Sequence, residues 1–152
     1  MSRITGLVTN PFIITAISSW LVAQVLKLII HTIIYKKFDI ARLFGDGGMP
    51  SGHSATVTAI AVSSGMIYGM ASFEFAVTAV LAIIVMHDAM GVRLETGKQA
   101  KMINDIVELL LNQNQKLSQE EQLKELVGHT PLQVFFGGVL GAVVALVCYL
   151  IM

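Results

Sequence analysis

The sequence is poor in charged residues and in cysteine. Asp, Glu, Lys and Arg make up 13% of the 152 residues, their formal charges cancel at pH 7, and the four histidines are scattered. Because a nucleic-acid surface needs clustered Lys and Arg, no nucleic-acid partner is expected. Cys148 is the single cysteine, which excludes an intramolecular disulfide and a metal site built on cysteines.

Apolar residues make up 55% of the chain and predict a membrane protein. They gather in four runs, Pro11–Tyr35, Ala55–Met70, Phe73–His87 and Leu132–Met152. A helix needs about 20 residues to cross the hydrocarbon layer, so the middle two runs need their flanks. We predict an all-α integral membrane bundle of about four transmembrane helices, forming a single domain over residues 1–152. The first run is too long for a signal peptide and is expected to be retained.

Basic residues outside the runs predict the orientation. Eight lie in the first and third connections, and Arg3 stands alone on the opposite side; the eight are Lys36, Lys37, Arg42, Arg93, Lys98, Lys101, Lys116 and Lys124. The positive-inside rule places loops 36–50 and 93–130 in the cytoplasm and both termini outside. The third connection contains an insertion at about 94–127, with an amphipathic helix around residues 103–110 and a polar linker at 113–122.

Polar clusters stand at the predicted cytoplasmic ends of three runs, at residues 48–54, 87–99 and 128–133. In an antiparallel bundle they meet at one membrane face. The run from Pro50 to Ser54 places His53 and two hydroxyls at a helix start, where free N–H groups attract an anion such as phosphate. The alternative is that Ser51 only caps the helix.

Several charged or titratable residues are further site candidates. Arg93 offers a fork of donors that suits phosphate; the alternatives are a salt bridge to Asp88 or Glu95, or a lipid-headgroup anchor. Thr130 before Pro131 predicts a helix start just after His129, which is either a nucleophile or an interfacial polar residue.

The first run carries a polar stripe at helical spacing, formed by Trp20, Gln24, Lys27 and His31. Lys27 lies about 12 Å below the cytoplasmic end of the run. It needs either Asp88 as a counter-charge or a bound phosphate. Gln24 and His31 are expected to form hydrogen bonds between helices.

These blocks resemble the divergent type-2 phosphatidic acid phosphatase family, related to acid phosphatases and vanadium-dependent haloperoxidases. The blocks are residues 47–55, 88–93 with 97–100, and 128–131. The resemblance implies a phosphatase-like site without metal or cofactor. It implies that His53 is a general acid, Arg93 a phosphate ligand and His129 a nucleophile that forms a phosphohistidine. Lys27, Ser51 and Gly52 are expected to bind phosphate as well, supported by Asp88, Gln133 and Lys98.

The sequence departs from the superfamily pattern in three places. Gln133 stands where an orienting Asp is expected, and it lacks the charge that would stabilise an imidazolium. Residues 94–128 separate Arg93 from His129, where the superfamily has five residues, so the insertion must fold away. The opening Lys and Arg-Pro motif is absent in strict form: Lys36 and Arg42 are spaced by five residues, and Lys27 fits loosely.

Three functions follow as hypotheses. The first is a phosphatase acting on a phosphate monoester or diphosphate, a lipid phosphate above all. The second is a Mg²⁺-dependent lipid headgroup enzyme that uses Asp88, Glu95 and Asp105 as ligands. The third is a non-catalytic membrane assembly or phosphate-binding protein. The small-residue stripe Gly137, Gly141 and Ala145 permits close helix packing, and a homodimer is expected because four spans barely enclose a cavity.

Overall fold

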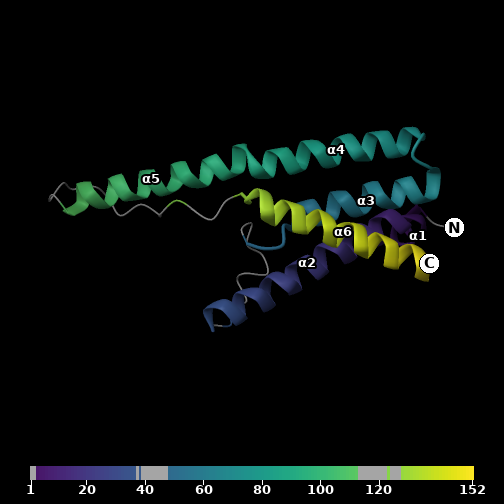
Figure 1. Cartoon of the computed structure of the whole chain (residues 1–152), viewed down its shortest axis with the longest axis horizontal. Coiled ribbons are helices and arrows are strands. Elements are labelled where there is room, and N and C mark those ends of the chain that lie inside the picture. The colour runs from purple at the N-terminus through teal and green to yellow at the C-terminus, as the bar shows by residue number, and fades with distance from the viewer. Residues whose placement is uncertain (1–2, 37, 39–47, 113–122, 124–127) are drawn as a thin grey trace.

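The computed structural model describes residues 3–36, 38, 48–112, 123 and 128–152, and the described part is all-helical. Its helices are α1 (Arg3–Val8), α2 (Pro11–Tyr35), α3 (Gly52–Tyr68), α4 (Phe73–Met90), α5 (Val92–Asn112) and α6 (Pro131–Ile151). Both termini and the α3–α4 turn lie at one end of the bundle, and the starts of α3 and α6 lie toward the other (Figure 1). The prediction of an all-α fold is confirmed.

Membrane-spanning character is clear for three helical stretches in the described residues. Pro11–Tyr35, Phe73–Leu109 and Pro131–Ile151 are long and apolar enough to cross a bilayer. Their outward side chains are apolar, for instance Ile83 at 63% and Leu150 at 74% exposure. In a bilayer these faces meet lipid rather than water. Helix α3 has 17 residues, so the fourth predicted span stays a prediction.

Helix α3 lies at the centre of the bundle and contacts α2, α4 and α6. Its buried residues are glycine, alanine and serine, so neighbouring helices can approach closely. A Cβ added at Gly137 of α6 would lie 2.4 Å from the backbone oxygen of Ser51, and one at Gly141 would lie 2.2 Å from that of Ala55. The small-residue stripe of α6 therefore packs against α3 of the same chain, and the homodimer stays a prediction.

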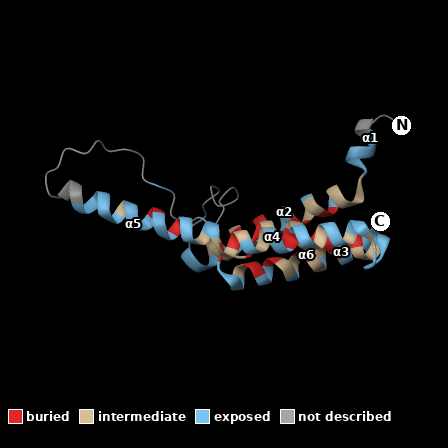
Figure 2. Ribbon diagram, turned by 90° about the horizontal axis from the view of Figure 1, so that it is seen from above, coloured by how far each residue is buried: buried red, intermediate tan, exposed pale blue. Residues whose placement is uncertain are grey.

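Helix α5 continues in the direction of α4 and extends beyond the bundle (Figure 1), and most of its surface is exposed (Figure 2). Among the described helices it contacts α4. Ile103 and Ile106 are about half exposed, at 47% and 50%. Asn104 binds the returning chain, since its side chain donates to the backbone oxygen of Leu123 and accepts from its N–H. The predicted linker at 113–122 lies outside the described residues.

Helix starts follow the sequence signals. Ser51 caps α3 by accepting from the N–H of Ser54, and Thr130 caps α6 in a capping box with Gln133. Both predicted helix starts are confirmed. These caps also place the two histidines His53 and His129 at helix starts, because each cap stands within two residues of a histidine.

Candidate functional site

Two histidines from distant parts of the sequence meet at the starts of α3 and α6. The ring centroids of His53 and His129 lie 6.1 Å apart, with an angle of 61° between the ring planes. His53 belongs to the first turn of α3, and His129 immediately precedes the cap of α6. The backbone joins the same two segments, since the N–H of Ser51 donates to the backbone oxygen of Gln133 at 3.0 Å. The sequence predicted this convergence from the three polar clusters.

His129 is held tightly and is only 1% exposed. Its backbone N–H donates to the oxygen of Ala89 at 2.9 Å, which ties the start of α6 to the end of α4. Its Nδ1 lies 3.4 Å from Oε1 of Gln133. Its Nε2 is buried and has no hydrogen-bond partner among the described residues. Because buried polar atoms are nearly always paired, this nitrogen is the first candidate in the site for contact with a bound ligand.

The contact with Gln133 assigns the ring's tautomer. Oε1 of Gln133 also accepts from the backbone N–H of Thr130 at 3.1 Å, which identifies it as the amide oxygen. An amide oxygen only accepts, so Nδ1 of His129 must carry the hydrogen. In the neutral ring the lone pair then lies on Nε2, the position a nucleophile requires. Gln133 thus contacts the ring through a neutral amide and not through a carboxylate.

Burial lowers the pKa of His129 below its ordinary value of 6.5. Burial is the largest cause, because it penalises the charged ring. The contacts with Gln133 and with the backbone of Gly48 favour the protonated ring, whereas the charges of Lys27 and His53 disfavour it. The net direction keeps His129 neutral at neutral pH. A neutral imidazole is the form that attacks phosphorus.

Lys27 reaches the site from α2 although it lies among apolar residues. Its side chain is buried at 5% exposure, and a Cβ added at Gly48 would lie 3.3 Å from its Cγ. Gly48 has a φ of +98°, a conformation that favours glycine, so it provides both the turn and the space. The positive charge of Lys27 is also among the causes that lower the pKa of His129.

The serine hydroxyls at the start of α3 form hydrogen bonds within the first turn of the helix. Ser51 and Ser54 are fully buried, and Oγ of Ser54 donates to Oγ of Ser51 at 3.0 Å. Gly52 lies against the indole of Trp20, because a Cβ there would lie 3.5 Å from its Cδ1. The capping role weighed for Ser51 is therefore observed, and the predicted phosphate contacts of Ser51 and Gly52 stay predictions.

Arg93 lies beside His129 through its backbone, but its guanidinium is engaged elsewhere. A Cβ at Gly128, where φ is +85°, would lie 2.5 Å from the carbonyl carbon of Arg93. The returning chain thus packs directly on the start of α5, as the predicted folding away of the insertion requires. Nε of Arg93 donates to Oδ2 of Asp88 at 2.7 Å, and both side chains are more than 40% exposed. The salt bridge weighed as an alternative is present.

The residues of the magnesium hypothesis do not gather. Glu95 pairs with Lys98 at 2.7 Å, an exposed pair one turn apart on α5, and Asp88 pairs with Arg93. Within residues 3–36, 48–112 and 128–152, no three His, Cys, Asp or Glu side chains come close enough to hold a metal ion. Lys98 thus lies on the exposed side of α5, paired with Glu95.

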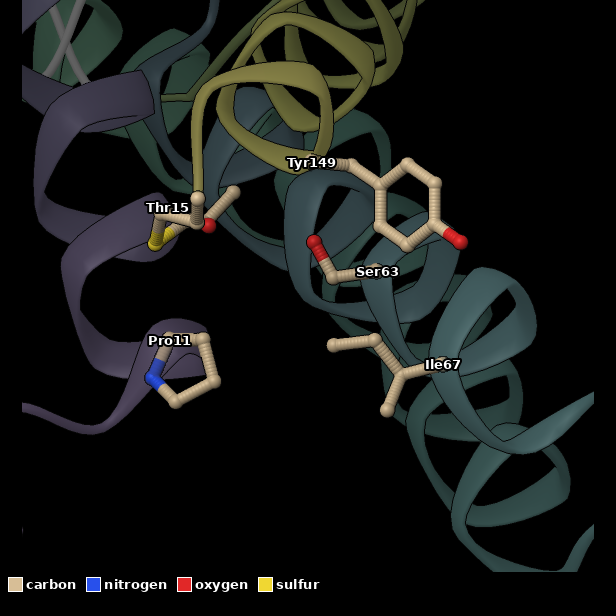
Figure 3. A pocket seen from close by; sticks show the side chains of 6 residues that line it. Pro11, Thr15, Ser63, Ile67 and Tyr149 are labelled. Carbon is tan, nitrogen blue, oxygen red and sulfur yellow. The ribbon is translucent and has the colours of Figure 1, made fainter.

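A cavity lies at the end of the bundle where α2 begins and α6 ends. It has a volume of about 180 Å³ and is lined by Pro11, Thr15, Ser63, Ile67, Tyr149 and Met152 (Figure 3). Thr15 and Ser63 present hydroxyls to it, but it contains no titratable group that could act as a base near neutral pH. We assign it no chemistry.

Sequence reasoning missed three glycine contacts that build the site. Gly48 leaves space for the side chain of Lys27, Gly128 lies against the backbone of Arg93, and Gly52 lies against the ring of Trp20. Each glycine lies within the polar clusters, so the signal was present. What the sequence could not show is which backbone or side chain would approach each one.

The fold and this site define a helical membrane protein in which the buried His129 lies beside His53, with the buried Lys27 nearby and Arg93 paired with Asp88. Such a set of groups suits a phosphate anion. The sequence model of the divergent PAP2 family matches residues 8–144. The chain therefore belongs to the divergent PAP2 family, as the polar blocks predicted.

A curated relative supports this membership over nearly the whole chain. The uncharacterized membrane protein YuiD of Bacillus subtilis (strain 168) is 39% identical over 150 residues, covering 93% of this chain and 95% of YuiD. No solved structure matches this chain.

Proposed function

We propose that this protein is a membrane phosphatase in which His129 attacks the phosphorus of a phosphate ester. The observation that carries the proposal is the buried Nε2 of His129, which has no hydrogen-bond partner in the described part of the chain while Gln133 holds the hydrogen on Nδ1. The fold fixes the backbone of His129 through Ala89 and its ring through Gln133. A ring held so firmly is suited to in-line attack, where positioning supplies much of the catalysis.

The reaction proceeds in two balanced steps. Nε2 forms a bond to phosphorus while the bond to the ester oxygen breaks, and a protonated His53 gives its proton to the departing oxygen. This leaves a phosphohistidine and a neutral His53. Water then attacks phosphorus, His53 takes a proton from the water, and the bond to Nε2 breaks to release phosphate. Lys27 and Arg93 neutralise the charge on the phosphate oxygens.

Arg93 must change partner to take this role. Its Nε is bound to Asp88, but an exposed ion pair contributes only about 0–1 kcal/mol. A phosphate dianion beside His129 would compete with Asp88 for the same fork of donors. We infer that Asp88 holds the arginine near the site until substrate arrives.

The substrate proposed is a phosphate monoester or diphosphate whose headgroup lies at the membrane border. The starts of α3 and α6 stand at the ends of apolar helices, so the histidine pair lies at headgroup depth. The excess of Lys and Arg in loops 36–50 and 93–130 supports a cytoplasmic site with the termini outside. The same reaction would also hydrolyse soluble phosphate esters.

Phosphate release by purified protein in nanodiscs tests the proposal. His129→Ala is expected to lower release by about 10³-fold or more, because it removes the nucleophile. His31→Ala is the matched control, since His31 belongs to α2 and its ring lies against Tyr35. Release that persists in His129→Ala would overturn the proposal. Addition of EDTA separates it from the magnesium hypothesis, because the histidine mechanism continues in chelator.

A non-catalytic phosphate-binding protein is the second candidate. The neutral Gln133 favours it, because a carboxylate would stabilise the imidazolium and Gln133 does not. Phosphate binding that requires His129 and Lys27, without any turnover of an ester, would favour this second function.

A further inference from the structure

An apolar groove runs along the outside of the bundle between α2 and α6. It has a volume of about 280 Å³ and is walled by one face of each helix, with Met49 and Pro50 at one side. Its α2 wall is formed by Leu26 and Ile30, one turn apart. Its α6 wall includes Phe136, Leu140 and Val143, which share a face at spacings of four and three residues.

Several residues that line the groove are close neighbours in the sequence of residues in the proposed phosphate site. Leu26 directly precedes the buried Lys27. Pro50 directly precedes Ser51, whose N–H binds the backbone of Gln133. Phe136 lies one turn beyond Gln133, the partner of His129. Each wall of the groove therefore begins beside a residue of the site.

The groove also has the direction that a lipid substrate needs. From Phe136 to Val143 it follows α6 for about 10 Å away from the histidine end and along the membrane-spanning helix. Phe136 and Val143 are 42% and 52% exposed, so the groove opens toward the lipid and a chain can enter sideways. A headgroup at His129 and a chain along α6 would then lie as they do in a bilayer leaflet.

From this geometry we infer that the groove between α2 and α6 holds the hydrocarbon chain of an alkyl or prenyl phosphate whose phosphate lies at His129 and Lys27. The inference rests on the proposed function for the identity of the headgroup. The groove's effect is on position more than on affinity, because lipid tails are as apolar as the side chains that line it. Holding the chain along α6 brings the phosphorus to Nε2 in a fixed orientation.

A photoreactive dodecyl phosphate with a diazirine on its chain tests the inference in nanodiscs. Cross-links are expected on residues 26–30 and 136–143. The matched probe is the same chain ending in an alcohol, which lacks the phosphate anchor and is expected to label these residues about tenfold less. Equal labelling by the two probes would mean that bulk lipid occupies the groove, and it would overturn the inference. Labels spread over the outer face of α4, at Ile83 and Ile84, would do the same.

Filling the groove gives a second readout. Leu140→Trp is expected to reduce phosphate-probe labelling of residues 26–30 by about tenfold. Ile84→Trp, on the lipid-exposed face of α4, is the matched control and is expected to leave labelling unchanged. Should Leu140→Trp fail to fold, Leu26→Trp fills the groove from α2. Labelling that neither groove variant reduces would overturn the inference.

The His129→Ala protein separates this inference from the proposed function. It is expected to release no phosphate and yet to be labelled in the groove, because Lys27 and the groove walls remain. Wild-type protein that is labelled in the groove but hydrolyses no ester would refute the proposed function and leave the groove in place. Wild-type protein that hydrolyses the ester but is labelled elsewhere would overturn the groove inference and leave the proposed function in place.

Discussion

Oε1 of Gln133 lies 3.4 Å from Nδ1 of His129, and this contact orients the ring in the absence of a carboxylate. The same oxygen accepts from the N–H of Thr130, so one side chain both caps α6 and fixes the imidazole. The start of a membrane helix and the orientation of the proposed nucleophile are thereby coupled.

Replacing Gln133 separates its two roles. Gln133→Leu removes both hydrogen bonds, and we expect phosphate release to fall on the order of 10- to 100-fold, with a loss of about 1 kcal/mol of stability from the cap. Gln133→Glu keeps both acceptors and adds a charge that stabilises the imidazolium, so it is expected to retain release. Release rates and thermal unfolding in detergent measure the two effects. Full activity in Gln133→Leu would show that the ring needs no such partner.

The pH dependence of phosphate release follows from the lowered pKa of His129. The neutral ring is the nucleophile, so we expect His129 to keep release active down to pH values below 6.5, the ordinary pKa of histidine. Lys27→Met removes a positive charge that disfavours protonation, and the acidic limit should therefore move to higher pH. A pH–rate profile of both proteins measures this limit. A limit that moves to lower pH in Lys27→Met would contradict the assignment.

Stability should follow the same titration. Because the pKa of His129 is lower in the folded than in the unfolded protein, protonation favours unfolding. The contribution of His129 to stability is complete above pH 6.5 and is lost as the pH falls from 6.5 through the lowered pKa of the folded state. Thermal unfolding of the wild type and of His129→Gln between pH 7.5 and 5 measures it, and the wild type should lose more stability than the variant. Equal losses would contradict the expectation.

Close packing of α3 on α6 predicts a sharp difference between neighbouring glycines. A Cβ in Gly137→Ala would collide with the backbone of Ser51, and we expect a loss of about 1–3 kcal/mol. Gly138→Ala is the matched control, because its Cβ would meet only Oγ1 of Thr58 at an ordinary 3.6 Å. Melting temperatures in detergent compare the two. Equal melting temperatures would refute the packing.

Gly128 and Gly69 form a second matched pair, because both have positive φ values, +85° and +84°. Gly69→Ala meets no atom within 4 Å, so it should cost only the backbone strain, about 1–3 kcal/mol. Gly128→Ala also collides with the backbone of Leu94 and should displace His129. Unfolding and phosphate release measure both variants, and only Gly128→Ala is expected to lose release. Normal release in Gly128→Ala would separate the loop from the site.

Much of this site could be predicted from the sequence because its signals are local. Ser51 and Thr130 mark helix starts, and those starts carry His53 and His129. The contacts of the α6 stripe could not be predicted, since small residues permit close packing against any helix, and α3 competes with a second copy of the chain. The engagement of Arg93 by Asp88 was one of several alternatives, because sequence spacing does not decide between an ion pair and an anion.

The phosphohistidine is the central claim, and trapping it is the most direct measurement. Protein incubated with a ³²P-labelled ester and quenched in alkali should carry label on the peptide that contains residue 129, and the label should be lost on acid treatment. Label should be absent from His129→Ala and should persist in chelator. Release of phosphate without any label on His129, or label carried by another residue, would contradict the account.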